Sequence, residues 1–122
     1  MTRVRVTPGR LALGLCFYCA IYAMPSVSGR PTMDECLEGS DFIRNAALSR
    51  DAGIAGDAFL DRMREDFLVI HAFPSALRWF VHDDADEIFL AEETELVFEQ
   101  PSDPNDHRAH FLRVCVDRMA GD

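Results

Sequence analysis

Two histidines near the C-terminus are the first residues whose types and spacing suggest chemistry. His107 and His110 are three positions apart, so they share one face of a helix, and Asp103 and Asp106 stand nearby as oxygen donors. Imidazole and carboxylate groups in this pattern are typical of zinc sites and of hydrolytic sites built on zinc. However, two histidines at this spacing recur by chance, and no third strong ligand is fixed by the spacing. We expect no metal and no cofactor, and a metal-binding or hydrolytic protein is the alternative function.

Arg50 and Asp51 are a second candidate, a site for an anionic ligand or a protein partner. Both precede Gly53 and fall on the apolar arc of the helix predicted there. A guanidinium group on such an arc needs a partner, because burying an unpaired charge is costly. If the partner is a carboxylate or the carbonyl groups at the end of the same helix, Arg50 is structural. If it is a bound anion or another protein, Arg50 is a recognition residue.

Arg78, Trp79 and Phe80 are the third candidate, the most aromatic patch after the leader described below. Arginine and tryptophan dominate many protein interfaces, which favours an interaction surface. Tryptophan is also mostly buried in folded proteins, so an anchor of the hydrophobic core is the default interpretation. The sequence has no nucleophile elbow, no glycine-rich phosphate loop and no constellation of cysteine and histidine. Catalysis is therefore the weaker hypothesis.

Residues 1–29 have the pattern of a secretory signal peptide. Three arginines and no acid precede an uncharged run at 11–25, and small residues follow it. This run is shorter than the roughly 20 residues that cross a bilayer as a helix. We expect cleavage near residue 29, which leaves a single domain over 30–122. The product is expected to be periplasmic or secreted, without stable membrane insertion.

The charge of residues 30–122 limits the partners of this domain. They hold nine arginines, no lysine and all twenty-one acidic residues, a formal net charge of 9 − 21 = −12. Phosphate backbones and anionic lipids repel such a surface, so we expect no nucleic-acid binding. A protein partner or self-association remains compatible with it.

Cys36 and Cys115 are the two cysteines left after removal of the leader, and they have one possible pairing. In an oxidising compartment this disulfide is the expected state. Both cysteines fall on the apolar faces of predicted helices, the first and the last. A bridge that closes so long a loop stabilises the fold by about 4 kcal/mol in the chain-entropy model.

Apolar residues recur at the helical period in four stretches, and no strand pattern is present. Thr32 and Glu35 form a capping box at the start of the first helix, and Gly53 ends that helix. The second helix is predicted over 57–72. The third is predicted over 84–99, with Ile88 and Phe89 on one side and Leu90 on another.

Pro104 suits the first turn of the last helix, and the segment 75–82 is predicted to be a short helix of two turns. The expected fold is all-α, a small bundle of four to five helices with one disulfide joining the first and last.

Four short sequence elements follow one another along the domain: Cys36, Arg50-Asp51-x-Gly53, Arg78-Trp79-Phe80, and Phe111-Leu112-x-x-Cys115. This frame resembles an uncharacterised family of small exported proteobacterial proteins. The resemblance covers nearly all of the domain and implies export, helical structure and the Cys36–Cys115 bridge, but no activity. In size, acidity and single disulfide, the domain is more distantly similar to periplasmic acid-stress chaperones, without a shared motif.

These patterns together favour a non-catalytic exported protein that binds or interacts with another protein. A periplasmic stress protein or a chaperone-like protein is a specific version of this hypothesis. The candidate interaction residues are Arg50, Asp51, Arg78, Trp79 and Phe80, together with the second face of the helix predicted over 84–99.

Overall fold

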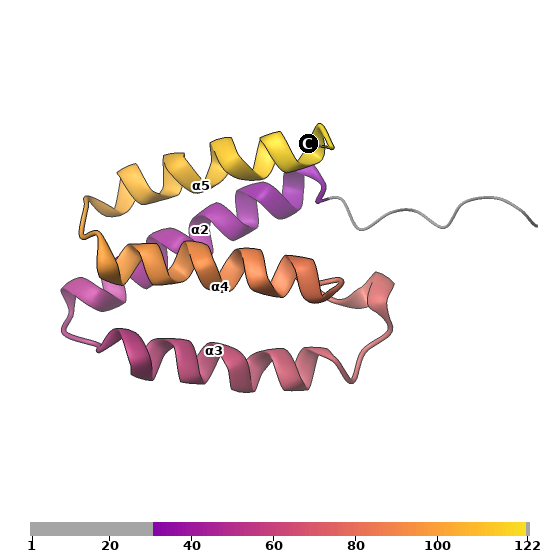
Figure 1. Ribbon diagram of the computed structural model, residues 1–122, viewed down its shortest axis with the longest axis horizontal. Coiled ribbons are helices and arrows are strands. Elements are labelled where there is room, and N and C mark those ends of the chain that lie inside the picture. The colour runs from indigo at the N-terminus through magenta and orange to yellow at the C-terminus, as the bar shows by residue number, and fades with distance from the viewer. Residues whose placement is uncertain (1–30, 122) are drawn as a thin grey trace, which may run out of the picture.

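The computed structural model describes residues 31–121 as a bundle of helices (Figure 1). The elements in chain order are α2 (Met33–Asp51), α3 (Gly56–Ile70), the short 3-10 helix η2 (Ser75–Leu77), α4 (Asp84–Glu99) and α5 (Pro104–Met119). α2 and α5 lie side by side, α4 packs against α2, and α3 lies at the edge beside α4. The all-α prediction is confirmed. The predicted leader lies outside the described residues.

The helix ends follow the local signals in the sequence. The Thr32 side chain accepts a hydrogen bond from the Glu35 amide, and the Glu35 side chain accepts one from the Thr32 amide, which is the predicted capping box. Gly53 has a φ of 98°, the left-handed conformation that terminates α2. Pro104 occupies the first turn of α5, and the Asp103 side chain caps it.

Small residues allow α2 and α5 to approach each other closely. A Cβ atom at Gly39 would lie 2.7 Å from the Phe111 ring, so the ring occupies the space that a larger residue would need. Cys36 and Cys115 are both fully buried and form the predicted disulfide, with their Cα atoms 5.6 Å apart. The first and last helices are therefore joined both by packing and by a covalent bond.

α4 buries residues from both of the sides on which the sequence places its apolar groups. Leu90, Thr94 and Val97 are fully buried, together with the carboxylate of Asp86. Phe89 is also buried, whereas Ile88, expected on the same side as Phe89, is 58% exposed. The polar Thr94 and the charged Asp86 occupy core positions, where hydrogen bonds satisfy them.

A chain of aromatic contacts runs from the edge of the bundle to its centre. Each ring contacts the next with centroids 5.4–5.9 Å apart, in the order Phe98, Phe59, Phe42, Trp79, Phe80, Phe111 and Phe89. Such tilted pairs add to the free energy of burial. α3 joins the bundle through one end of this chain and through the buried Met63 and Phe67.

The prediction of a two-turn helix over 75–82 is wrong. A single 3-10 turn spans Ser75–Leu77, and the chain after it is extended at Arg78. The guanidinium group of Arg78 donates hydrogen bonds to the carbonyl oxygens of His71, Phe73 and His82. These carbonyls can be gathered around one side chain only because the segment is not helical.

No helix within residues 31–121 is long and apolar enough to cross a membrane.

Loss of the disulfide should lower the free energy of unfolding by about 4 kcal/mol, because the bond restricts the unfolded chain across a separation of 79 residues. Guanidinium denaturation of the double variant Cys36→Ala/Cys115→Ala measures this loss. The parent protein in reductant should behave as the variant does, and the variant itself should not respond to reductant. A loss below about 1 kcal/mol would contradict the chain-entropy argument.

Candidate functional site

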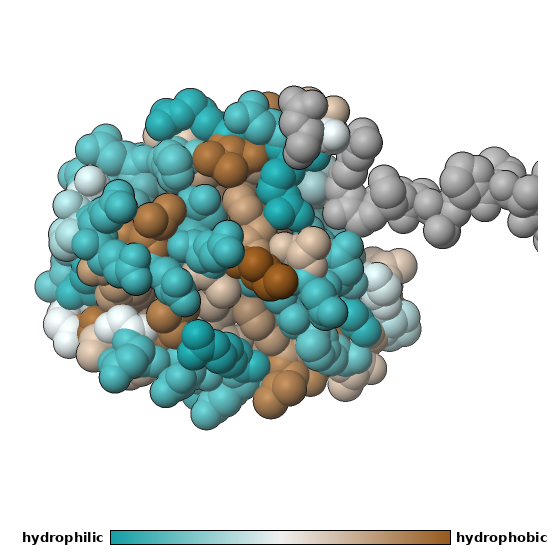
Figure 2. Space-filling view, in the orientation of Figure 1, coloured by the Kyte–Doolittle hydropathy of each residue, from teal (hydrophilic) through white to brown (hydrophobic). Residues whose placement is uncertain are grey.

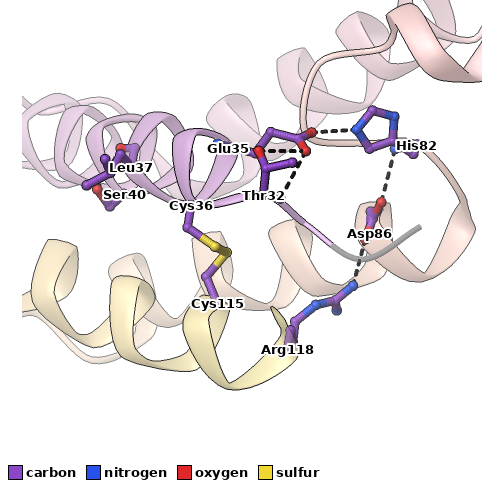
Figure 3. Close-up of a disulfide and its surroundings, with 9 residues drawn as sticks. All are labelled: Thr32, Glu35, Cys36, Leu37, Ser40, His82, Asp86, Cys115 and Arg118. Atoms are coloured by element: carbon purple, nitrogen blue, oxygen red, sulfur yellow. Dashed lines mark hydrogen bonds and ion pairs between the residues drawn. A yellow bond between two sulfur atoms is a disulfide. The ribbon is translucent and has the colours of Figure 1, made fainter. Parts of the chain in front are cut away.

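A polar cluster lies beside the disulfide, at the end of the bundle where α2 begins and α5 ends (Figure 3). His82 is at its centre. The Nε2 atom of the His82 ring is 2.5 Å from Oε2 of Glu35, and the Nδ1 atom is 2.7 Å from the carbonyl oxygen of Ser75. The His82 backbone amide donates to Oδ2 of Asp86. One residue thus joins α2, η2 and α4.

The buried carboxylate of Asp86 extends this cluster to α5. Its Oδ1 atom accepts a hydrogen bond of 2.6 Å from the Arg118 guanidinium, which also lies 4.3 Å from the centroid of the Phe89 ring. Burial raises the pKa of the Asp86 carboxyl, and the neighbouring Asp83 adds to this, against the opposing effects of the His82 amide and Arg118. Removal of one partner from so buried an ion pair leaves an uncompensated charge, so Arg118 holds the fold together at this point.

Arg50 binds the C-terminal end of another helix. Its guanidinium donates to the carbonyl oxygens of Val97 and Ser102, at 2.8 and 2.7 Å, and to Oδ1 of Asp51. α4 has no basic residue in its own last turn, where a positive charge would interact favourably with the negative end of the helix dipole. Arg50 supplies that charge from α2. We expected a carboxylate or the carbonyls of its own helix end; Arg50 does bind the Asp51 carboxylate, but the carbonyls that it binds belong to α4 and the loop after it.

His107 lies beside Arg50 at the same helix end. Its Nε2 atom lies 3.4 Å from the Arg50 guanidinium. Burial, and then the charge of Arg50, lower the pKa of His107. A neutral His107 can accept a hydrogen bond from Arg50.

His110 has a different partner, the Glu93 carboxylate, at 3.4 Å. Burial raises the pKa of Glu93, and His110 opposes this. Both histidines line a shallow pocket of about 240 Å³ between α4 and α5, with Leu96, Gln100, Ser102 and Asp106. Within residues 31–121, no three His, Cys, Asp or Glu side chains are grouped so that they could hold a metal ion. The structure thus gives the two histidines different partners, Arg50 for His107 and Glu93 for His110.

The aromatic candidate serves mainly the core. Phe80 is 1% exposed. Trp79 is half-buried and donates a hydrogen bond of 2.7 Å from Nε1 to the Glu38 carboxylate. Arg78 is occupied by the three backbone carbonyls described above. Because these side chains and Arg50 all have internal partners, none of them is presented to a ligand as a free binding group.

The exposed apolar side chains lie elsewhere, on a surface that the sequence patterns did not single out. Five of them gather near the end of α3, in η2 and at the start of α4: Leu68, Val69, Phe73, Leu77 and Ile88. Contact between His71 and Glu87 joins the end of α3 to the first turn of α4, and η2 lies in the chain between these two helices. We call these five residues the apolar surface. Its signal in the sequence is Leu68-Val69, which lies outside the narrow apolar face of α3.

Comparison of the chain with protein-family models, with curated proteins and with solved structures found no match. The resemblance to small exported proteobacterial proteins therefore stays a prediction.

Replacement of Arg50 should destabilise the fold without any ligand present. Arg50→Met leaves the Val97 and Ser102 carbonyls without their donors. The part-buried Val97 carbonyl costs about 1–3 kcal/mol when it is left unsatisfied, whereas the exposed Ser102 carbonyl can bond water. We expect urea denaturation to show a loss of about 1–3 kcal/mol. Arg113→Met is the matched control, because Arg113 is exposed and forms no ion pair within the described residues. Equal effects of the two substitutions would show that Arg50 does not cap α4.

Proposed function

We propose that this chain is a non-catalytic exported binding protein that uses the apolar surface to bind a basic, partly apolar segment of another protein. The main support for this proposal is the exposure of the five apolar side chains, of which Leu68 and Leu77 are 71% and 72% exposed. Single exposed apolar residues are common, but several on adjoining segments are typical of interaction sites. A disulfide in the core supports an oxidising destination, the periplasm or the medium.

The charges around the apolar surface favour a basic partner. Asp84 and Glu92 lie one turn to either side of Ile88 on α4, and Glu65 lies one turn before Leu68 on α3. These three carboxylates are exposed and form no ion pair within residues 31–121. The nearby arginines of α3 are already paired with Asp61 and Asp66. The surface therefore has an uncompensated negative charge, which attracts cationic partners and repels a second copy of this acidic chain.

Apolar and charged groups alternate on the molecular surface rather than forming one broad apolar area. On the face in Figure 2, hydrophobic residues form separate patches among hydrophilic ones. A purely apolar partner would leave the intervening carboxylates desolvated and unpaired, at a considerable cost. A segment with alternating leucine and lysine side chains satisfies both kinds of group.

Synthetic peptides test this proposal directly. A 16-residue peptide with leucine and lysine at helical spacing should bind the chain from residue 30 at least about tenfold more tightly than its leucine and glutamate counterpart. Added salt should weaken the binding, because exposed charges are screened. Fluorescence anisotropy of labelled peptides measures both effects.

Leu77→Ser should weaken binding of the lysine peptide by about tenfold, since it removes one apolar contact without adding charge. Leu48→Ser is the matched control, because Leu48 is also exposed but lies near the end of α2, outside the apolar surface. Equal binding of the two peptides, or equal effects of the two substitutions, would contradict the proposal. So would sedimentation showing a dimer of the parent chain that Leu77→Ser dissociates, because the partner would then be a second copy.

A further inference from the structure

Hydrogen-bond partners around His82 determine how many protons its ring must carry. Nδ1 faces the carbonyl oxygen of Ser75, and Nε2 faces the carboxylate of Glu35. A carbonyl oxygen and a carboxylate oxygen are acceptors only, and a neutral imidazole has a single N–H. Both contacts can be hydrogen bonds only when a proton lies at each nitrogen. The observed arrangement therefore requires one proton more than a neutral histidine and an ionised glutamate hold.

Glu35 already has another set of donors, and this places the extra proton on His82. Its Oε1 atom accepts from the backbone amide and from the hydroxyl of Thr32. These two donors satisfy Oε1 without a proton on the carboxyl group, so we assign the extra proton to the imidazole. The pair is thus an imidazolium bound to a carboxylate, and both side chains are about four-fifths buried.

We propose that the His82 imidazolium, held between the Ser75 carbonyl and the Glu35 carboxylate, is a proton-operated latch that orders η2 in mildly acidic surroundings and releases it at neutral to alkaline pH. Charged groups from every packed element surround the latch: Glu35 from α2, Asp83 and Asp86 from α4, Arg118 from α5 through Asp86, and Arg78 through the His82 carbonyl.

Loss of the proton breaks the attachment of η2 to α2. The lone pair of a neutral ring then faces either the Ser75 carbonyl or the Glu35 carboxylate, and that contact becomes repulsive. The reciprocal bond from the Ser75 hydroxyl to the His82 carbonyl lies within the same segment and does not replace it. Phe80 and Val81 stay buried, so the release is confined to the residues before them. These include Phe73 and Leu77, which belong to the apolar surface.

The direction of the pH dependence follows from the pKa of His82. Burial lowers this pKa, but the hydrogen bonds to Ser75 and Glu35, together with the negative charges of Glu35 and Asp86, outweigh burial and raise it above its ordinary value of 6.5. The folded chain therefore holds the proton more tightly than the unfolded chain does. The stabilisation is complete below about pH 6.5 and is lost as the pH rises through the raised value. Mild acid should tighten this end of the bundle.

Two measurements on the chain from residue 30 test the latch. The ¹⁵N shifts of the His82 ring should show protons at both nitrogens at pH 6, where an ordinary histidine is already partly neutral. The amides of Leu77 and Arg78 donate to the carbonyls of Pro74 and Ser75 within η2. Their hydrogen-exchange protection, corrected for intrinsic exchange rates, should fall by about tenfold between pH 5.5 and pH 8, the effect of losing one charge-assisted hydrogen bond.

Variants separate the latch from general effects of pH. In His82→Gln the protection of the Leu77 and Arg78 amides should be low at both pH values. In Glu35→Gln the ring should lose its second proton at a lower pH than in the parent chain. His110→Gln is the control, because His110 pairs with Glu93 at another site, and it should keep the pH response of the parent. A singly protonated His82 ring at pH 6, or protection that is equal at both pH values in the parent, would overturn the proposal. Neither measurement uses a peptide, so failure of the proposed function would leave the latch separately tested.

Discussion

α2 and α5 approach each other closely because Gly39 has no side chain where the Phe111 ring lies, and the Cys36–Cys115 bond fixes that contact. The remaining elements depend on this pair. Arg50 of α2 caps the C-terminus of α4, and Arg118 of α5 pairs with Asp86 in its first turn. α4 has many acids and no base. Its ends are therefore stabilised by side chains from the two helices that the disulfide joins.

The sequence predicted those features that local chemistry determines. Thr32, Gly53 and Pro104 mark helix ends through interactions with their own neighbours in the chain, so they could be recognised without the fold. The disulfide followed from counting, because two cysteines have one pairing. The helical period located α2 to α5, since each of them buries part of its surface in the bundle.

Features that depend on distant residues could not be predicted in the same way. Asp86 of α4 lies in the core, where its carboxylate is paired with Arg118 from near the other end of the chain. Arg50 was recognised as a residue needing a partner, but the partner carbonyls lie about fifty residues further along. The acceptors around His82 likewise come from Glu35 and Ser75, which sequence spacing does not relate to each other.

The position of the disulfide also affects how the chain responds to a protease. The disulfide joins residue 36 to residue 115, so α3, η2 and α4 all lie inside the closed loop. The longest run of exposed residues within 31–121 is the stretch 71–77 after α3. A single cut there opens the loop but separates nothing, because both fragments remain linked through sulfur. The nicked molecule keeps all its helices at an effectively unchanged local concentration, and only a reductant lets the two pieces diffuse apart.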